Sequence, residues 1–213
     1  MIKEVNAMKL YVIRHGQSED NVARRHSGWA ECSLTEKGEA DARRAGELLK
    51  GIVFDKVFSS DTKRAKQTCA LALPDAVPEY TWLIRETNVG SLTGLEVAEC
   101  QKRWGEVYDE RRKARNFCPY GGENRAMHME RVRKFLDLAV SGGWNTVAAF
   151  SHGGSIHCML DIAMGAEQNK AEYPCLNAAC RSSITKTACG HSKNGAGPNN
   201  FPDFSLHFRA FLL

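Results

Sequence analysis

Residues 9–16 read KLYVIRHG, a short apolar run that stops abruptly at a basic pair and a glycine. Residues 146–154 read TVAAFSHGG and have the same arrangement. Both runs are short and apolar, and the first is rich in residues that favour strands, as is typical of buried strands. The sequence therefore predicts two buried strands, each followed by polar residues that include a histidine and a glycine.

Helical and strand-like patterns alternate around these two runs. In the first half, the predicted elements are a helix over 35–50 that starts at the capping box Ser33–Glu36 and ends at Gly51, a strand over 53–59, a helix capped by Ser60 or Asp61 that runs to about 73, and a strand or extended segment over 77–84. In the second half they are an amphipathic helix over 123–140, a helix over 155–164, strands over 182–186 and 204–211, and a long loop over 188–202.

This alternation of strands and helices predicts an α/β fold. We expect a three-layer α/β/α sandwich with a mostly parallel central sheet, because parallel strands are connected by crossovers that cover both faces. The length of the chain favours one domain over residues 1–213. Residues 88–124 are rich in charge and glycine and include a helical piece over 97–115. We expect this segment to form a lid inserted over one end of the sheet.

Composition excludes several classes of function. Hydrophobic residues make up 43% of the 213 residues and the net charge is only +4, which indicates a globular protein without a nucleic-acid or membrane partner. No apolar run approaches the ~20 residues that a membrane-spanning helix needs. The start of the chain, residues 1–7, lacks the apolar core of a secretory leader, and the eight cysteines include no C-x-x-C pair. We therefore expect a cytoplasmic protein with reduced thiols.

The predicted strand ends bring cationic side chains together. In parallel α/β sheets, ligands bind beyond the carboxyl ends of the strands. Arg14 and His15 follow one strand, His152 follows another, and Arg64 lies in the first turn of a helix after a third. Arginine side chains bind phosphate oxygens in a bidentate manner, and a histidine among them can attack phosphorus. Gly16 and Gly153 would let backbone N–H groups approach the phosphate closely.

The same residues make a poor metal site. Metal ions prefer neutral imidazoles and carboxylates without competing cations. A second candidate is the group Cys175, Cys180, Cys189 and His191, whose spacings match no usual zinc finger. We therefore expect no metal and no cofactor.

Four blocks of the chain carry a resemblance to a known family. They are Arg14–Ser18 with Asn21, Gly28 with Ser33–Gly38, Ser59–Thr68, and Ser151–Gly154. They resemble, in order, the R-H-G-[EQ]-[ST]-x-x-N opening, the G-x-x-D-x-P-L-T-x-x-G segment, the S-S-x-x-x-R-A-x-Q-T helix start and the second histidine block of the histidine phosphatase superfamily, in its phosphoglycerate mutase-like branch. The match covers about residues 9–165.

The resemblance implies roles for these positions. His15 would be the nucleophile that becomes phosphohistidine, while Arg14, Arg64 and His152 would hold the phosphoryl oxygens. The substrate pocket would also include Asn21, Gly28 and Gly153.

A further block implies the general acid. Glu86 would serve, because RETNVG at 85–90 resembles the family's R-E-x-x-F-G-x-W-E-G block, although Val89, Leu92 and Thr93 replace its Phe, Trp and Glu. Glu79 and Glu96 are alternative acids, and Glu86 could instead form a surface ion pair with Arg85.

The protonation states follow from the neighbours of each group. We expect the two arginines to lower the pKa of His15, and burial or a bound phosphate dianion to raise the pKa of Glu86. The other histidines, His26, His128, His157, His191 and His207, are expected to be structural or exposed.

The function expected from these features is hydrolysis of a phosphomonoester, through a phosphohistidine, on a small phosphorylated metabolite. Two alternatives remain open. One is a cofactor-dependent phosphoglycerate mutase, but such mutases usually carry E-R-H-Y-G in place of the acid block and a longer insertion before the second histidine. Here only 66 positions separate Glu86 from His152. The other alternative is a non-catalytic phosphate-binding relative. A homodimer is left open, and no other macromolecular partner is expected.

Overall fold

The computed structural model describes residues 8–165 and the backbone of 182–186 and 206–211. Its six-stranded sheet has the order β3-β2-β4-β1-β6-β5, and all neighbours are parallel except β5 and β6. The mostly parallel sheet that the sequence predicts is thus confirmed. The strands are β1 Lys9–Arg14, β2 Lys56–Ser60, β3 Glu79–Thr81, β4 Thr146–Ser151, β5 Ser182–Lys186 and β6 Leu206–Phe211.

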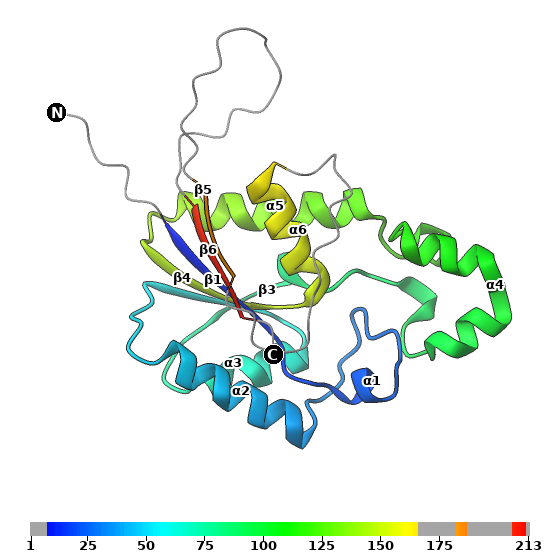
Figure 1. Cartoon of the computed structure of the whole chain (residues 1–213), viewed down its shortest axis with the longest axis horizontal. Helices are drawn as coiled ribbons and strands as arrows, with labels where there is room; N and C mark the ends of the chain where they lie inside the picture. The colour runs from blue at the N-terminus through cyan, green and yellow to red at the C-terminus, as the bar shows by residue number, and fades with distance from the viewer. Residues whose placement is uncertain (1–7, 166–181, 187–205, 212–213) are drawn as a thin grey trace, which may run out of the picture.

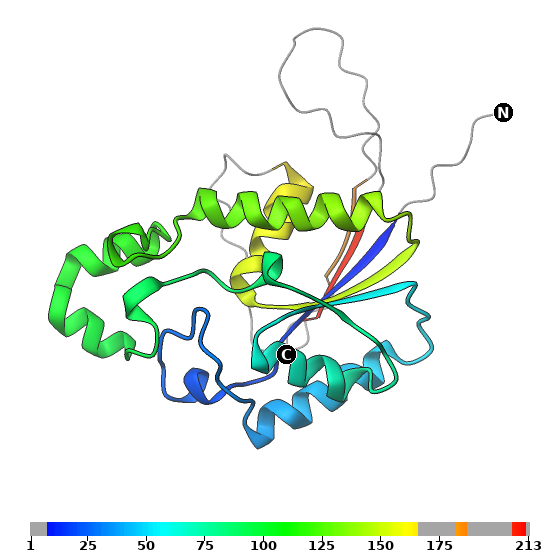
Figure 2. The same cartoon turned by 180° about the vertical axis from the view of Figure 1, so that it is seen from behind.

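Helices cover both faces of the sheet, which confirms the three-layer sandwich. Figure 1 shows α2 and α3 on one face and α5 and α6 on the other, and the view from behind in Figure 2 shows the same layers. In the described part of the chain, no helix has the length and hydropathy needed to span a membrane. The helices are α1 Glu19–Val22, α2 Glu36–Leu49, α3 Lys63–Ala72, α4 Val97–Lys113, α5 Arg125–Ser141 and α6 Gly153–Met164, with short 3₁₀ turns η1 Trp82–Ile84, η2 Gly90–Leu92 and η3 Cys118–Tyr120.

The two central strands are apolar along their length because both of their faces are covered. In β1, Leu10 and Val12 pack toward α5 and α6, whereas Tyr11 and Ile13 pack toward α2 and α3. β4 alternates in the same way. Successive strand residues point to opposite faces, so a strand covered on both faces reads as a continuous hydrophobic run. This explains why these two stretches dominate the sequence pattern.

The register between β1 and β4 places the two histidines side by side. Arg14 is paired with Ser151, and the backbone N–H of His15 donates to the Ser151 carbonyl at 2.9 Å. His15 and His152 therefore leave adjacent parallel strands at the same level. The carboxyl edge of the sheet is where the site is built.

The segment 88–124 has a small hydrophobic core of its own. Val89, Leu92, Cys100, Tyr108 and Phe117 are buried against one another. The long helix α4 bends sharply at Gly105, which has a φ of 56° that glycine adopts without strain. Figure 1 shows α4 at the side of the molecule toward which the carboxyl end of β1 points, and the role of the segment as a lid stays a prediction.

Two predicted helix caps are wrong. Helix α2 is capped by Thr35, whose hydroxyl accepts a hydrogen bond from the Gly38 N–H at 3.1 Å, and not by Ser33. Helix α3 begins after Thr62 rather than Ser60 or Asp61, and has no side-chain cap. The Thr62 hydroxyl is used elsewhere, because it contacts Nε2 of His152 at 3.2 Å. In α3, a tertiary contact has therefore replaced the local side-chain cap.

Several predicted boundaries are also shifted. β2 begins at Lys56 rather than at 53, because Asp55 accepts hydrogen bonds from the backbone of Asn145 and Thr146 in a turn. The segment 77–84 forms only the short β3 and then the turn η1. Helix α5 begins at Arg125, where the Asn124 side chain caps it, and α6 begins at Gly153. The 188–202 loop and the group Cys175, Cys180, Cys189 and His191 lie outside the described residues.

Candidate active site

His15 is oriented by its own backbone. Its Nδ1 donates to the Gly16 carbonyl at 2.7 Å, so the lone pair of the neutral ring is on Nε2. That lone pair accepts a hydrogen bond from the Nε–H of Arg64 at 3.3 Å, which an incoming phosphoryl group would have to replace. Burial lowers the pKa of His15, and the charges of Arg64 and Arg14 lower it further, to about 3. The expected lowering is confirmed, with burial as its largest cause, and His15 is neutral at neutral pH.

Arg64 is held in place by backbone carbonyls. Only 1% of its surface is exposed, and its two terminal nitrogens donate to the Ala30 carbonyl at 2.9 Å and the Gly28 carbonyl at 2.8 Å. Gly28 has a φ of 44°. The predicted pocket residue Gly28 therefore contacts Arg64, and its carbonyl fixes the guanidinium over His15.

His152 lies beside His15, with ring centroids 5.0 Å apart. Its Nε2 contacts the hydroxyls of Ser60 at 2.9 Å and Thr62 at 3.2 Å. Its Nδ1 is buried and has no hydrogen-bond partner within the described structure. Burial, with the charge of Arg64, keeps the pKa of His152 well below its usual value. When one of these hydroxyls donates to Nε2, Nδ1 carries the proton and can donate to a phosphoryl oxygen.

Glycines allow the polar loops to come together. A Cβ atom on Gly16 would lie 2.2 Å from the Gly38 carbonyl oxygen, so the loop after β1 can pack against α2 only with glycine there. Gly153 begins α6, and a Cβ on it would lie 3.6 Å from Nε of Arg14. The first N–H groups of α6 and the Arg14 side chain therefore flank the same region.

Glu86 lies at the start of α6. Its Oε2 accepts a hydrogen bond from the Gly154 N–H at 3.0 Å, and its Oε1 accepts one from the Thr87 N–H at 2.8 Å. It forms no ion pair with Arg85, whose guanidinium binds Asp61 at 2.6 and 2.7 Å. The structure thus places Glu86 in the same cluster as His15, Arg64 and His152.

The expected direction of the Glu86 pKa is wrong for the ligand-free site. Burial acts to raise the pKa of Glu86, but the charge of His128 and the N–H groups of Gly154 and Thr87 outweigh it and lower the pKa to about 2. A carboxylate that accepts backbone hydrogen bonds is stabilised in its ionised form. Glu86 is therefore ionised until a ligand or a proton changes its surroundings.

A buried ion pair fixes the segment that carries Glu86. Arg131 binds the carboxylate of Glu123 at 3.0 and 2.9 Å, and it donates to the carbonyls of Leu83 at 2.8 Å and Arg85 at 3.0 Å. Glu123 also accepts from the Asn88 N–H at 2.9 Å. The two side chains anchor the chain on both sides of Glu86.

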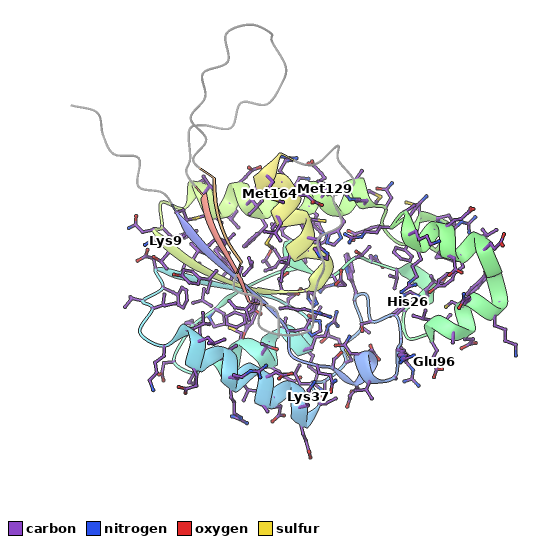
Figure 3. All side chains as sticks on the ribbon, viewed as in Figure 1. Lys9, His26, Lys37, Glu96, Met129 and Met164 are labelled. Carbon is purple, nitrogen blue, oxygen red and sulfur yellow. The ribbon has the colours of Figure 1, made fainter. Side chains whose placement is uncertain are left out.

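Three other predicted residues lie differently. Asn21 is exposed, and its side-chain carbonyl accepts from the Ser18 N–H at 3.1 Å in a capping box, so its substrate contact stays a prediction. Glu79 on β3 binds Lys56 on β2 at 2.7 Å, and Glu96 binds Arg25 at 3.7 Å where the segment 88–124 meets the loop after α1 (Figure 3). Neither alternative acid is in the cluster.

Sequence reasoning missed the residues that support the site. Ser60 and Thr62 stand in the third family block, where Ser60 is predicted only as a helix cap and Thr62 has no predicted role. His128 is expected to be structural or exposed, and it is structural, because it is buried and bonded to Thr87 and Ser155; what the sequence does not indicate is that these bonds lead to Glu86. One signal was available, because His128 shares a helix face with Val132 and Phe135 at the spacing i, i+4, i+7.

These features give an α/β fold with a neutral histidine, a second histidine, two arginines and a carboxylate at the carboxyl edge of its sheet. Such a cluster suits transfer of a phosphoryl group, because cations can hold the phosphoryl oxygens while Nε2 of His15 attacks. The chain belongs to the histidine phosphatase superfamily, branch 1, whose family description matches residues 10–194.

Known proteins of two kinds resemble the chain. It is 36% identical over 169 residues to a 2,3-bisphosphoglycerate-dependent phosphoglycerate mutase of Methylorubrum populi, covering 73% of this chain and 79% of that protein. It is 35% identical over 162 residues to the broad-specificity phosphatase YOR283W of Saccharomyces cerevisiae, covering 73% and 70%.

Solved structures show the same two kinds. The alpha-ribazole phosphatase of Shigella flexneri superposes with a TM-score of 0.68 at 26% identity, over 73% of this chain and 79% of that one. The phosphoglycerate mutase of Bacillus anthracis superposes with a TM-score of 0.71 at 25% identity, over 85% and 90%.

Proposed function

We propose that the protein is a cytoplasmic phosphomonoester hydrolase that acts on a small phosphorylated metabolite through a phosphohistidine, without a metal or cofactor. One observation carries the proposal. Nε2 of His15 lies 3.3 Å from the Arg64 guanidinium, while Nδ1 is tied to the Gly16 carbonyl. This arrangement presents a neutral nucleophile beside a fixed cation that can hold the phosphoryl oxygens.

The reaction has two steps. Nε2 of His15 attacks phosphorus and the bond to the ester oxygen breaks, while a protonated Glu86 gives its proton to the leaving alkoxide. Water then attacks the phosphohistidine, and the Glu86 carboxylate takes the proton from the water as inorganic phosphate and neutral His15 are released. Arg14, Arg64 and Nδ1 of His152 hold the phosphoryl oxygens in both steps. Glu86 alternates between acid and base, so the cycle returns it to its starting state.

Mutase activity is the second candidate, because several relatives at about 35% identity carry that name. A mutase must protect the phosphohistidine from water while the intermediate turns around. The short connection between Glu86 and His152 favours a lid that admits water, and therefore hydrolysis.

One experiment separates these functions. The purified chain is incubated with a panel of phosphorylated metabolites and with para-nitrophenyl phosphate, and released inorganic phosphate is measured for the wild type and for His15→Ala. A parallel reaction contains 3-phosphoglycerate and 2,3-bisphosphoglycerate, and formation of 2-phosphoglycerate is followed. Phosphate release that depends on His15 supports the hydrolase, whereas isomerisation faster than phosphate release establishes the mutase.

The non-catalytic alternative has its own outcome in this experiment. A wild type that binds inorganic phosphate but turns over none of the compounds would be a phosphate-binding relative. The same preparation, examined by sedimentation, shows whether the chain forms a homodimer.

A further inference from the structure

A hydrogen-bonded chain of four side chains runs from Glu86 into the interior through Thr87, His128 and Ser155. Oε1 of Glu86 lies 3.3 Å from the Thr87 hydroxyl, which lies 2.9 Å from Nδ1 of His128. Nε2 of His128 lies 2.8 Å from the Ser155 hydroxyl, which donates to the Arg85 carbonyl. Thr87 is 7% exposed, His128 1% and Ser155 not at all. This hydrogen-bonded chain is therefore shielded from water except at its Glu86 end.

The last contact fixes the tautomer of His128. The single proton of Ser155 is donated to the Arg85 carbonyl, so the Ser155 oxygen must accept from His128. Nε2 of His128 therefore carries a proton in every state. The nitrogen that gains or loses a proton is Nδ1, and it faces the Thr87 hydroxyl.

The Thr87 hydroxyl can then point in two directions. When His128 is neutral, Thr87 donates to Nδ1, and its lone pairs face a Glu86 that carries a proton. When His128 is charged, Nδ1–H donates to Thr87, and Thr87 donates to an ionised Glu86. The two arrangements contain the same number of protons and differ only in where one of them sits.

We propose that Glu86, Thr87 and His128 form a proton relay, in which His128 is a positioning residue that stores and returns the proton of the general acid. In the relay step Nδ1–H of His128 breaks as an O–H bond forms at Thr87, and the former Thr87 proton bonds to Oε1 of Glu86. The step turns imidazolium and carboxylate into neutral imidazole and carboxylic acid, so charge and protons balance. This inference rests on the proposed function of the same site.

Charged groups around the relay govern its proton. Burial lowers the pKa of His128 to about 4, against Glu86, which raises it. Arg131 and Arg115 lower it and Glu123 raises it, while a proton on His128 in turn lowers the pKa of His152. A phosphate dianion bound at the cluster adds negative charge near both Glu86 and His128, which raises both pKa values. Substrate binding therefore favours the uptake of one proton by Glu86 and His128 before the leaving group departs.

The test compares two esters with different leaving groups. An alkyl phosphate such as glycerol 2-phosphate needs a proton on its leaving oxygen, whereas para-nitrophenyl phosphate needs little. His128→Phe and Thr87→Val should each lower kcat for glycerol 2-phosphate by about 10- to 100-fold, at the lower end of what general acids contribute. The loss on para-nitrophenyl phosphate should be smaller by at least about tenfold. Thr87→Ser restores the hydroxyl and should recover most of the loss.

The pH profile adds a readout that a packing defect does not change. A proton shared by two groups is held more tightly than by either alone, because the two binding sites add. In His128→Phe, the alkaline limb of kcat for glycerol 2-phosphate should move to lower pH. Met129→Ala is the matched control, because it opens a cavity on the same helix (Figure 3) and should affect both esters alike without moving the limb.

Several outcomes overturn the relay. They are equal losses on the two esters in His128→Phe and Thr87→Val, an unmoved alkaline limb, or no recovery in Thr87→Ser. If His128→Phe fails to fold, the pair Thr87→Val and Thr87→Ser decides alone. If the wild type is active on both esters and the variants lose the same factor on each, only the relay is overturned. If the wild type is inactive on both esters, the proposed function is overturned.

A measurement without turnover tests the relay in that last case. Proton–nitrogen correlation spectra of the imidazoles, recorded with saturating inorganic phosphate, report the tautomer and pKa of His128. We expect a proton on Nε2 at all pH values, and Glu86→Gln should lower the pKa of His128 because its anionic partner is lost. A neutral His128 with its proton on Nδ1, or a pKa unchanged by Glu86→Gln, overturns the inference.

Discussion

Gly154 lies so close to the Glu86 carboxylate that a Cβ atom on it would sit 2.1 Å from Oε1. The Gly154 N–H donates to the other oxygen, Oε2, at 3.0 Å. A glycine two residues after His152 thus lets the first turn of α6 contact both carboxylate oxygens of Glu86 closely. The second histidine block therefore supplies the proposed phosphate ligand His152 and also the N–H group that binds the proposed general acid.

Gly154→Ala should displace Glu86 without unfolding the protein. The added methyl group cannot share space with Oε1, and a shift of about 1 Å at a catalytic group can cost about 10²-fold in rate. Alanine favours the helix by about 1 kcal/mol over glycine, so stability should be kept. The check is kcat for an alkyl phosphate together with urea unfolding. If Gly154→Ala acts through Glu86, it should add little in a Glu86→Gln background, and additive losses would contradict this explanation.

Arg64→Ala should lower turnover more than stability. Its guanidinium is expected to hold charge that develops on the phosphoryl oxygens, and loss of one such contact costs about 10²–10³ in kcat. The Gly28 and Ala30 carbonyls also lose their donors, which should lower the free energy of unfolding by about 1–3 kcal/mol. Kinetics and urea unfolding of the same preparation measure both effects. Lys66→Ala on the same helix is the control, and a near-normal kcat in Arg64→Ala would remove this residue from the site.

Much of this arrangement follows from the sequence because strand ends are local features. The apolar runs before His15 and His152 predict two buried parallel strands, and parallel strands in register bring their carboxyl ends together. The family blocks add Arg64 and Glu86. Caps are harder to predict, since Thr62 gives its hydroxyl to His152 instead of to its own helix.

The supporting residues depend on contacts between distant segments. Thr87 meets His128 across 41 positions, and His128 meets Ser155 across 27. No local pattern encodes these pairings. The direction of the Glu86 pKa cannot be predicted from the sequence for the same reason, because it depends on N–H groups and on a histidine that other segments contribute.

Activity should not depend on a metal ion. In the proposed site, the charges of Arg14 and Arg64 balance the phosphate charge and the neutral ring of His152 donates a hydrogen bond to it, which is the task a metal would otherwise perform. Phosphatase activity measured after treatment with EDTA should equal that of untreated protein, and added Mg²⁺ or Zn²⁺ should not increase it. Loss of activity with EDTA and recovery with either ion would show that the cation cage is insufficient.

Stability should fall as the pH is lowered from about 6.5 toward 4. His15, His26, His128 and His152 have lowered pKa values in the folded protein, at about 3 for His15 and about 4 for His128. In this window the unfolded chain binds protons that the folded protein does not, so the unfolding free energy rises with pH. Each histidine contributes up to about 1.4 kcal/mol per pH unit. Urea unfolding at pH 7.5, 6 and 5 measures the slope, which His128→Phe should reduce by about a quarter because it removes one of these four histidines. A flat profile would show that the buried histidines are not held neutral.

His15 and Glu86 should fail in different ways when they are replaced. His15→Ala should abolish turnover and also the acid-labile phosphoenzyme trapped by rapid quench, since no other group in the cluster is oriented to attack. Glu86→Gln should slow an alkyl phosphate by about 10²–10⁴ but affect para-nitrophenyl phosphate far less, because that leaving group needs little protonation.

The wild-type pH profile should be bell-shaped. Its acid limb comes from protonation of His15, whose pKa of about 3 in the free protein places that limb well below neutral pH. Its alkaline limb comes from loss of the proton that Glu86 must carry when substrate is bound, and Glu86→Gln should remove that limb for the alkyl ester. Equal losses on both esters would move the general acid to another group, and a phosphoenzyme that survives His15→Ala would overturn the mechanism.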